Sequence, residues 1–173
     1  MGAQRILGID PGTATVGYGV IDCPTKETFR WIASGVIQTP RHLSAGERLA
    51  IIRADVLSLI DEHQPDCVAV EAIFFFKNAK TVIPVAQARG VILEAAATRQ
   101  TTAFEYTPMQ VKLNLTGFGR AEKRDVQEAV SRLLKLPEII KPDDAADAVA
   151  IAICHARLSL AAEQSSRPSP ASA

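Results

Sequence analysis

Several features that mark particular protein classes are scarce or absent in this sequence of 173 residues. The three cysteines, Cys23, Cys67 and Cys154, are widely spaced and odd in number, which argues against a disulfide framework or a CxxC zinc site. No apolar run approaches the roughly 20 residues of a membrane span, and the chain does not open with the basic and apolar segments of a secretory signal. We therefore expect a cytoplasmic protein without a membrane partner, whose cysteines are reduced and lie mostly in the core.

The sequence also lacks an excess of charge of either sign, because 19 basic residues balance 19 acidic residues. Proteins whose whole surface binds a polyanion are usually strongly basic, so a nucleic-acid site in this chain has to be a local patch. Histidine is equally scarce, and His42, His63 and His155 are scattered without the spacing of metal ligands. We interpret His155 as a cation near the end of a helix.

Apolar periodicity and turn signals predict an α/β fold over residues 1–164. Three strands follow one another so closely that they favour an antiparallel meander, and later strands alternate with helices, which is typical of a mixed sheet. The expected strands are residues 5–10, 16–22, 29–39, 67–70 and 103–107, and the expected helices begin at Ser44, Asn78, Glu122 and Pro142. Residues 165–173 are rich in Ser, Pro and Ala, so we expect a disordered tail after a single domain.

Two acidic residues stand where apolar strands end, and two more lie in the last helix. Because ligands gather at the carboxyl ends of strands in such sheets, Asp10 and Glu71 are expected to face one crevice. Asp144 and Asp147 are three positions apart and are therefore neighbours on one helical face. A purely structural alternative is that Asp143 and Asp144 are acids in the first turn of the helix, where the helix dipole favours negative charge. The four carboxylates together favour a site for two divalent cations, since Mg²⁺ prefers oxygen ligands and two cations stabilise the attacking and leaving oxygens of phosphoryl transfer.

Aromatic and basic residues indicate what kind of phosphate compound would bind at such a site. The segment AIFFFKNAK after Glu71 holds three adjacent phenylalanines, which either complete the core or expose a ring for stacking on a nucleobase. A second basic run surrounds the turn Gly117-Phe118-Gly119. The basic residues of the two segments are Lys77, Lys80, Lys112, Arg120, Lys123 and Arg124. We interpret them as the local patch that contacts nucleic-acid phosphates.

The stretch LGIDPGTATVGYG around Asp10 permits two interpretations, a phosphate-binding loop or a metal-binding carboxylate. ATPases of the actin and Hsp70 type also place an acid and glycines at a strand end, but they need a second, duplicated lobe that this chain is too short to hold. A dinucleotide-binding loop leads into a helix, whereas this stretch leads into a strand. We therefore interpret Asp10 as a metal ligand. Gly17 and Gly19 are expected to let DNA or a neighbouring strand approach the backbone.

Five motifs resemble, in order, those of the RuvC family of Holliday junction resolvases over about residues 4–160. They are GIDPGTATVGYGV, VAVEAIFFFKNAK, AQARGVILEAA, FEYTPMQVKLNLTGFGRAEK and PDDAADAVAIAICHA. The resemblance implies a ribonuclease-H-like fold with a mixed five-stranded sheet flanked by helices. It also implies a homodimeric endonuclease that resolves four-way DNA junctions by paired symmetric nicks, leaving 5′-phosphates, in homologous recombination and DNA repair. RuvA and RuvB, the branch-migration complex, are the implied partners.

The resemblance further implies a metal site. It places the catalytic and metal-binding acids on Asp10, Glu71, Asp144 and Asp147. The implied cofactor is two Mg²⁺ ions per subunit, for which Mn²⁺ can substitute. Other ribonuclease-H-like nucleases, which cut RNA or unbranched DNA, stay open as alternatives. A catalytically inactive junction-binding module is disfavoured because all four carboxylates are present.

Contacts with DNA and with a second subunit follow from the same motifs. The base-stacking phenylalanine of the family falls on Phe74, and its two phosphate-contacting lysines fall on Lys112 and Lys123. The helix that pairs across the dimer axis in the family matches the one expected here from Asn78. Its implied interface positions are Gln87, Arg89 and Gly90.

Overall fold

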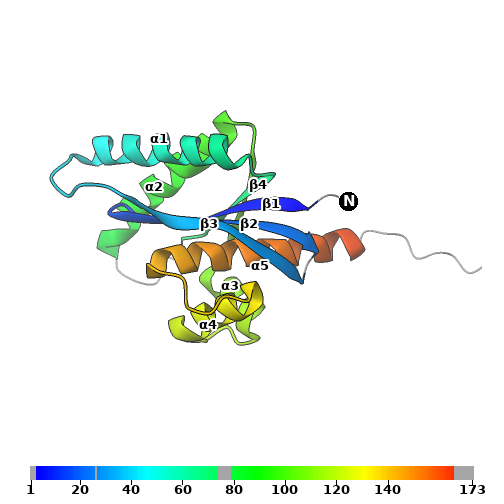
Figure 1. Ribbon diagram of the computed structural model, residues 1–173. Helices are drawn as coiled ribbons and strands as arrows, with labels where there is room; N and C mark the ends of the chain where they lie inside the picture. The colour runs from blue at the N-terminus through cyan, green and yellow to red at the C-terminus, as the bar shows by residue number, and fades with distance from the viewer. Residues whose placement is uncertain (1–2, 26, 74–78, 166–173) are drawn as a thin grey trace, which may run out of the picture.

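The computed structural model describes residues 3–25, 27–73 and 79–165 of the chain (Figure 1). The strands in these parts are β1 Gln4–Asp10, β2 Thr15–Thr25, β3 Thr28–Gln38, β4 Cys67–Glu71 and β5 Thr102–Tyr106. The helices are α1 Ala45–His63, α2 Ala79–Thr98, α3 Pro108–Thr116, α4 Lys123–Leu134 and α5 Asp143–Ser165. The predicted tail lies outside the described residues, apart from Ser165 at the end of α5.

All five strands form one mixed sheet in the spatial order β3-β2-β1-β4-β5. The first three strands are an antiparallel meander, as expected from the short connections between them. The other two follow helices, and β4 pairs parallel to β1 while β5 pairs parallel to β4. The predicted mixed five-stranded sheet is confirmed. The carboxyl ends of β1, β4 and β5 meet at one edge, where ligands gather in α/β folds.

Helices cover both faces of the sheet (Figure 1). α1 and α2 pack on one face, and α5 lies along the other with α3 and α4 against it. Side chains alternate across each strand, so Leu7 and Ile9 enter the core under α1 and α2, whereas Ile6 enters the core under α5. α5 is apolar on nearly every side because it lies between the sheet and two further helices.

Local signals determine where the helices begin and end. Ser44 caps α1 in a capping box with Glu47, as its spacing predicts, and Thr107 caps α3 in the same way. α3 ends at Gly117, whose φ of 78° lies in the left-handed region that favours glycine. Because Pro108 follows β5 almost directly, α3 starts at the carboxyl edge of the sheet.

Glycines allow α5 to lie close to the backbone of β1 and β2. A Cβ atom at Gly17 would collide with the carbonyl oxygen of Asp144, and one at Gly8 would collide with the carbonyl oxygen of Ala148. Gly19 faces the same helix. The expectation that Gly17 and Gly19 admit DNA or a neighbouring strand is therefore wrong, because the backbone that they admit belongs to α5. Their spacing of two places both on one face of β2, which is the signal that could have predicted this.

His155 is buried inside α5, with 1% of its surface exposed, so its interpretation as a cation near a helix end is wrong. Its Nδ1 atom lies 2.7 Å from the Tyr106 hydroxyl, and its Nε2 atom lies 3.1 Å from the Cys67 sulfur. Burial lowers the pKa of His155 to about 4, so the ring is neutral at pH 7. The three groups connect α5 to β4 and β5. All three cysteines are buried, as predicted.

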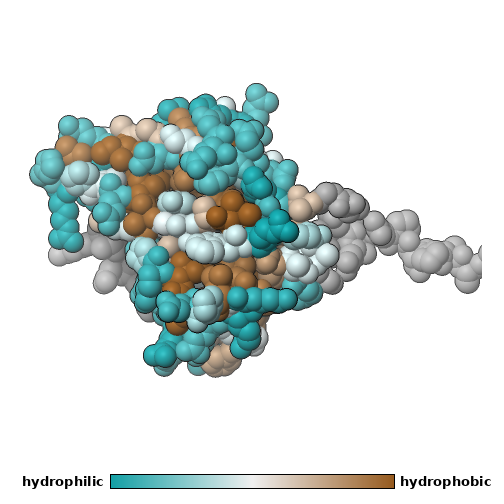
Figure 2. Space-filling view, viewed as in Figure 1, coloured by the Kyte–Doolittle hydropathy of each residue, from teal (hydrophilic) through white to brown (hydrophobic). Residues whose placement is uncertain are grey.

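The face seen in Figure 1 has a mixed surface (Figure 2). Hydrophilic side chains dominate the outer helices, and apolar surface shows between the helical layers, where the edge of the sheet faces the viewer. No helix in the described ranges is long and apolar enough to cross a membrane. The edge strand β3 exposes Trp31 and Ile32 to solvent.

Candidate metal centre

β1 and β4 bring the two strand-end acids to the same place. Ile9 pairs with Val70 across the parallel strands, so Asp10 and Glu71 are neighbours one residue further along. Ile9 and Val70 point into the core under α1 and α2, and side chains alternate along a strand. Asp10 and Glu71 therefore point to the other face, which α5 covers, at the carboxyl edge of the sheet.

The first turns of α5 bring the other two acids to this edge. Gly17 pairs with Asp10 in the sheet and lies directly beneath the backbone of Asp144, which places the start of α5 beside β1. One carboxylate oxygen from each of Asp10, Asp144 and Asp147 lies within 4.8 Å of the other two. We call these three residues and Glu71 the acidic cluster.

Burial and like charges shift the pKa values of this cluster. Burial raises the pKa of Asp10 to about 8, and repulsion from Glu71, Asp147 and Asp144 adds to that rise. Burial also raises the pKa of Glu71 to about 7, with repulsion from Asp147 as the next cause. The pKa of Asp147 is raised as well, first by burial. Half-buried carboxylates that repel one another, all offering hard oxygen ligands, fit a divalent cation.

Two lysines approach the acidic cluster from α3 and α4. Lys123 Nζ lies 2.8 Å from Asp147 Oδ2. Burial disfavours the Lys123 ammonium, but its hydrogen bond to Asp147 and the charges of nearby aspartates outweigh burial and raise its pKa. Lys112 acts on Glu71 by charge and offsets part of the rise in that carboxyl's pKa. The sequence predicts both lysines as phosphate contacts; the structure pairs Lys123 with Asp147, and it brings Lys112 within electrostatic range of Glu71. The ion pair of Lys123 was not predicted, because it depends on how α4 packs against α5.

Asp143 has a different environment from the acidic cluster. Lys141 Nζ lies 2.9 Å from Asp143 Oδ1, and this hydrogen bond lowers the pKa of the Asp143 carboxyl. Lys123 Nζ lies further away, at 3.9 Å from Asp143 Oδ2. Asp143 is thus a neutralised first-turn acid, which fits its exclusion from the predicted quartet.

The structure describes only some of the predicted DNA-contacting residues. Phe74 and Lys77 lie outside the described residues, as does the side chain of Lys80. Arg120 and Arg124 are exposed near the turn between α3 and α4. Arg124 Nε lies 2.9 Å from Glu128 Oε1, one helical turn further along α4, so part of its charge is already neutralised.

The predicted interface residues lie on α2. Gln87 and Gly90 are exposed, and Ile83, which lies one turn before them on the same helical face, exposes 67% of its surface. Arg89 is half-buried, and its guanidinium forms an ion pair with Glu105 of β5. In the single chain, Arg89 therefore ties α2 to the sheet, while Gln87 and Gly90 remain accessible.

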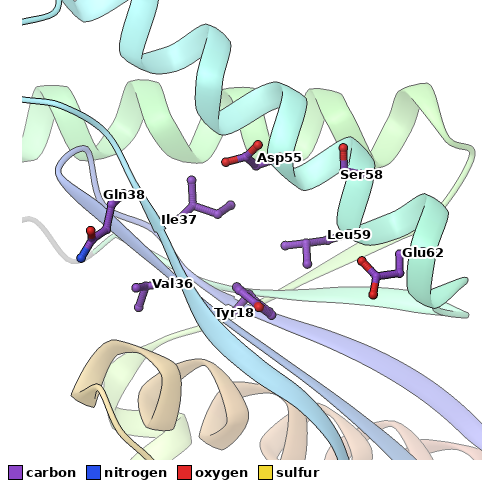
Figure 3. A pocket seen from close by; sticks show the side chains of 8 residues that line it. All are labelled: Tyr18, Val36, Ile37, Gln38, Asp55, Ser58, Leu59 and Glu62. Atoms are coloured by element: carbon purple, nitrogen blue, oxygen red, sulfur yellow. The ribbon is translucent and has the colours of Figure 1, made fainter.

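A shallow groove lies between α1 and β3, on the face of the sheet opposite the acidic cluster (Figure 3). Its lining residues are Tyr18, Val36, Ile37, Gln38, Asp55, Ser58, Leu59 and Glu62. The charged groups among them are the carboxylates of Asp55 and Glu62 on α1, which would repel a phosphate. The lining of the groove holds no basic side chain to offset them, whereas Lys112 and Lys123 accompany the acidic cluster, which is therefore the better candidate for a nucleic-acid backbone.

Comparisons with known proteins agree with this geometry. The model of the family described as "Crossover junction endodeoxyribonuclease RuvC" matches residues 6–155. The protein of that name from Fusobacterium nucleatum subsp. nucleatum is 50% identical over 152 residues, which is 88% of this chain and 80% of the relative. The one from Thermomicrobium roseum is 45% identical over 160 residues, 92% of this chain and 97% of the relative.

A solved structure gives the same result in three dimensions. The Thermus thermophilus RuvC in complex with Holliday junction substrate superposes with a TM-score of 0.87 at 35% sequence identity. The match covers 92% of this chain and 96% of that chain. The sheet order, the cluster of carboxylates at its carboxyl edge and these matches lead to one assignment: the chain belongs to the RuvC family of crossover junction endodeoxyribonucleases.

Proposed function

We propose that this protein resolves four-way DNA junctions in the cytoplasm by cutting two strands of like polarity at symmetric positions. The observation that carries the proposal is the acidic cluster, in which oxygens of Asp10, Asp144 and Asp147 lie within 4.8 Å of one another. A Holliday junction is named as the substrate of the Thermus thermophilus relative, which shares the fold over nearly the whole chain. The wider alternative, a nuclease for RNA or unbranched DNA, lacks support of this kind.

A crossover junction endodeoxyribonuclease with such a cluster works with a divalent metal ion, and we propose two Mg²⁺ ions per subunit. The oxygen donors fit this ion, and their raised pKa values mark a site that needs positive charge. We propose Asp10, Glu71, Asp144 and Asp147 as the ligands, and Mn²⁺ as an ion that can substitute for Mg²⁺. When bound, such ions activate water and stabilise the leaving oxygen in phosphodiester hydrolysis.

The protein's own residues hold the substrate around this centre. Lys112 and Lys123 approach the acids from two helices, so they can bind the phosphates that flank the cut. Arg120 and Arg124 extend this basic edge along the exposed turn and the start of α4. Phe74, Lys77 and Lys80 remain proposals from sequence alone. A single domain over residues 1–164 is proposed to carry all of these groups.

Two cuts in one junction require two metal centres, and we propose a homodimer that supplies them. The exposed face of α2 with Gln87 and Gly90 is the proposed contact, and Arg89 supports that face through its ion pair with Glu105. We further propose that RuvA and RuvB, the branch-migration complex, act with the dimer. The family assignment is the support for this last partnership.

The test compares wild type and Asp10→Asn on a four-way junction, a duplex and an RNA:DNA hybrid in Mg²⁺. We expect the wild type to nick the junction at paired positions and to leave the other substrates largely uncut. Asp10→Asn should abolish cleavage yet still bind the junction in EDTA, because it removes a metal ligand. Asp143→Asn is the matched control, which should keep cleavage. Cleavage by Asp10→Asn contradicts the metal assignment, and equal cleavage of duplex contradicts the substrate.

A further inference from the structure

Exposed apolar residues gather on one side of α3 and on the turn that follows it. Met109, Leu113 and Phe118 expose 57%, 54% and 61% of their surface, and we call these three residues the apolar shoulder. Met109 and Leu113 are four residues apart and share one helical face. A Cβ atom at Gly119 would lie 3.1 Å from Met109 Cγ, so the turn packs against this face. Large apolar side chains that stay exposed on neighbouring segments in this way indicate an interaction site.

The backbone that carries the Phe118 ring is held on both sides. The Gly117 N–H donates to the Leu113 carbonyl oxygen at 2.9 Å and closes α3. The Phe118 N–H donates to Thr116 Oγ1 at 3.1 Å, and the Phe118 carbonyl oxygen accepts from the Ala121 N–H at 3.0 Å. Because the turn is already ordered, a partner of the exposed ring would lose little affinity to ordering the loop.

Basic residues join the apolar shoulder to the acidic cluster. Lys112 lies in α3 beside the shoulder and acts by charge on Glu71. Arg120 follows the turn directly and is exposed. Lys123 lies three residues beyond Arg120 and reaches Asp147 at 2.8 Å. An exposed aromatic ring on a turn whose neighbours in the chain are basic is complementary to a nucleic-acid strand, which offers base faces and phosphates together.

We propose that Phe118 stacks on a nucleobase of the junction DNA, outside the metal centre, while Lys112 and Arg120 contact phosphates of the same strand. Met109 packs beside Gly119, the next residue of the same turn. The open centre of a four-way junction exposes base faces that a continuous duplex keeps stacked, so such a contact favours branched DNA. This inference rests on the proposed function and adds to it a second point at which the junction is held.

The experiment measures junction binding in EDTA by fluorescence anisotropy, together with quenching of 2-aminopurine placed at the branch point. Phe118→Ala should weaken junction binding about 10-fold and remove the quenching, because a base loses its stacking partner. Phe118→Tyr keeps the ring and should bind within about twofold of wild type. Trp31→Ala removes an exposed ring from β3 and serves as the matched control, with no expected change.

Salt dependence separates stacking from charge. Phe118→Ala should leave the slope of log K against log salt unchanged, whereas Arg120→Ala should reduce its magnitude by about one. Phe118 is exposed, so equal melting temperatures of wild type and variant are expected and show that the fold is intact.

Unchanged affinity and quenching in Phe118→Ala overturns the inference, and so does an equal loss of binding in Trp31→Ala. If the shoulder instead binds a second copy of the chain, Phe118→Ala changes the sedimentation mass and leaves junction binding intact, which also overturns it. A wild type that neither binds nor cuts the junction contradicts the proposed function. A wild type that does both, beside an unaffected Phe118→Ala, contradicts only this inference.

Discussion

Asp10 and Glu71, two acids of the proposed metal centre, lower the stability of the folded chain when they are ionised. Their carboxyl groups have pKa values of about 8 and about 7, because burial and neighbouring acids disfavour their ionised forms. In the unfolded chain the same groups ionise near pH 4. Ionising them in the folded state therefore lowers stability, and a cation bound to the cluster offsets that loss.

The first prediction concerns the pH dependence of stability without metal. A carboxyl whose folded pKa is raised stabilises the fold below its unfolded pKa, and this stabilisation is lost as pH rises through the folded value. In EDTA, the contribution of Asp10 and Glu71 to the free energy of unfolding should therefore fall from about pH 4 to about pH 8. Asp10→Asn should reduce that fall and be more stable than wild type at pH 8, by about 5 kcal/mol at most, measured by urea unfolding.

Asp143→Asn provides the comparison, because hydrogen bonding to Lys141 lowers the pKa of Asp143 instead of raising it. Removing this carboxyl should give no gain in stability at pH 8. Identical pH profiles for wild type and Asp10→Asn would show that Asp10 ionises normally in the folded chain.

The sequence predicted the acids better than it predicted their neighbours. Asp10 and Glu71 were visible because each ends an apolar strand, and parallel pairing brought them together as expected. His155 was misinterpreted because its hydrogen-bond partners, Tyr106 and Cys67, lie on strands far away in the chain. Pairings of this kind depend on how whole elements pack, and spacing within one segment carries no information about them.

At the scale of elements, the depth at which α5 lies on the sheet determines the metal centre. Apolar periodicity and turn signals located the strands and helices in the sequence, but they do not predict how closely a helix approaches the sheet. Gly8 and Gly17 decide that distance, because any larger side chain would meet the α5 backbone. The contact at Gly17 is with Asp144 itself, so the packing of α5 on the sheet also determines where this proposed metal ligand lies.

The second prediction tests this contact with Gly17→Ala. The added methyl group should push the first turn of α5 outward and destabilise the protein by about 1–3 kcal/mol, as overpacking does. It should also weaken Mn²⁺ binding, measured by calorimetry, because Asp144 moves away from Asp10.

Gly46→Ala in α1 is the matched control, since a Cβ atom there meets nothing within 4 Å. Gly46→Ala should keep Mn²⁺ affinity and gain up to about 1 kcal/mol of stability. Normal Mn²⁺ binding by Gly17→Ala would show that the close packing at Gly17 does not determine the position of the metal ligands.

At the scale of the whole molecule, the proposed activity needs more than one chain. Within the part of the chain that the structure describes, each copy contributes one such acidic cluster, at one edge of its sheet. Paired cuts therefore require two chains whose clusters face two strands of the same junction. α2 lies on the opposite face of the sheet from α5, so two copies joined through α2 would leave both metal centres accessible (Figure 1). Ile83, Gln87 and Gly90 lie on one exposed side of this helix. A second copy that covered the isoleucine would remove its apolar surface from water, which stabilises the contact.

The third prediction tests this arrangement with Gly90→Leu. A Cβ atom at Gly90 meets nothing within 4 Å in the single chain, so the new side chain fits the folded protomer and improves helix propensity. Across a helix pair it would collide with the partner, and dimer dissociation should become at least about 10-fold easier by sedimentation analysis. Junction cleavage should then shift from paired cuts to single nicks. Gly46→Leu, equally open on α1, should remain dimeric and cut in pairs. A Gly90→Leu dimer as tight as wild type would place the contact between subunits elsewhere.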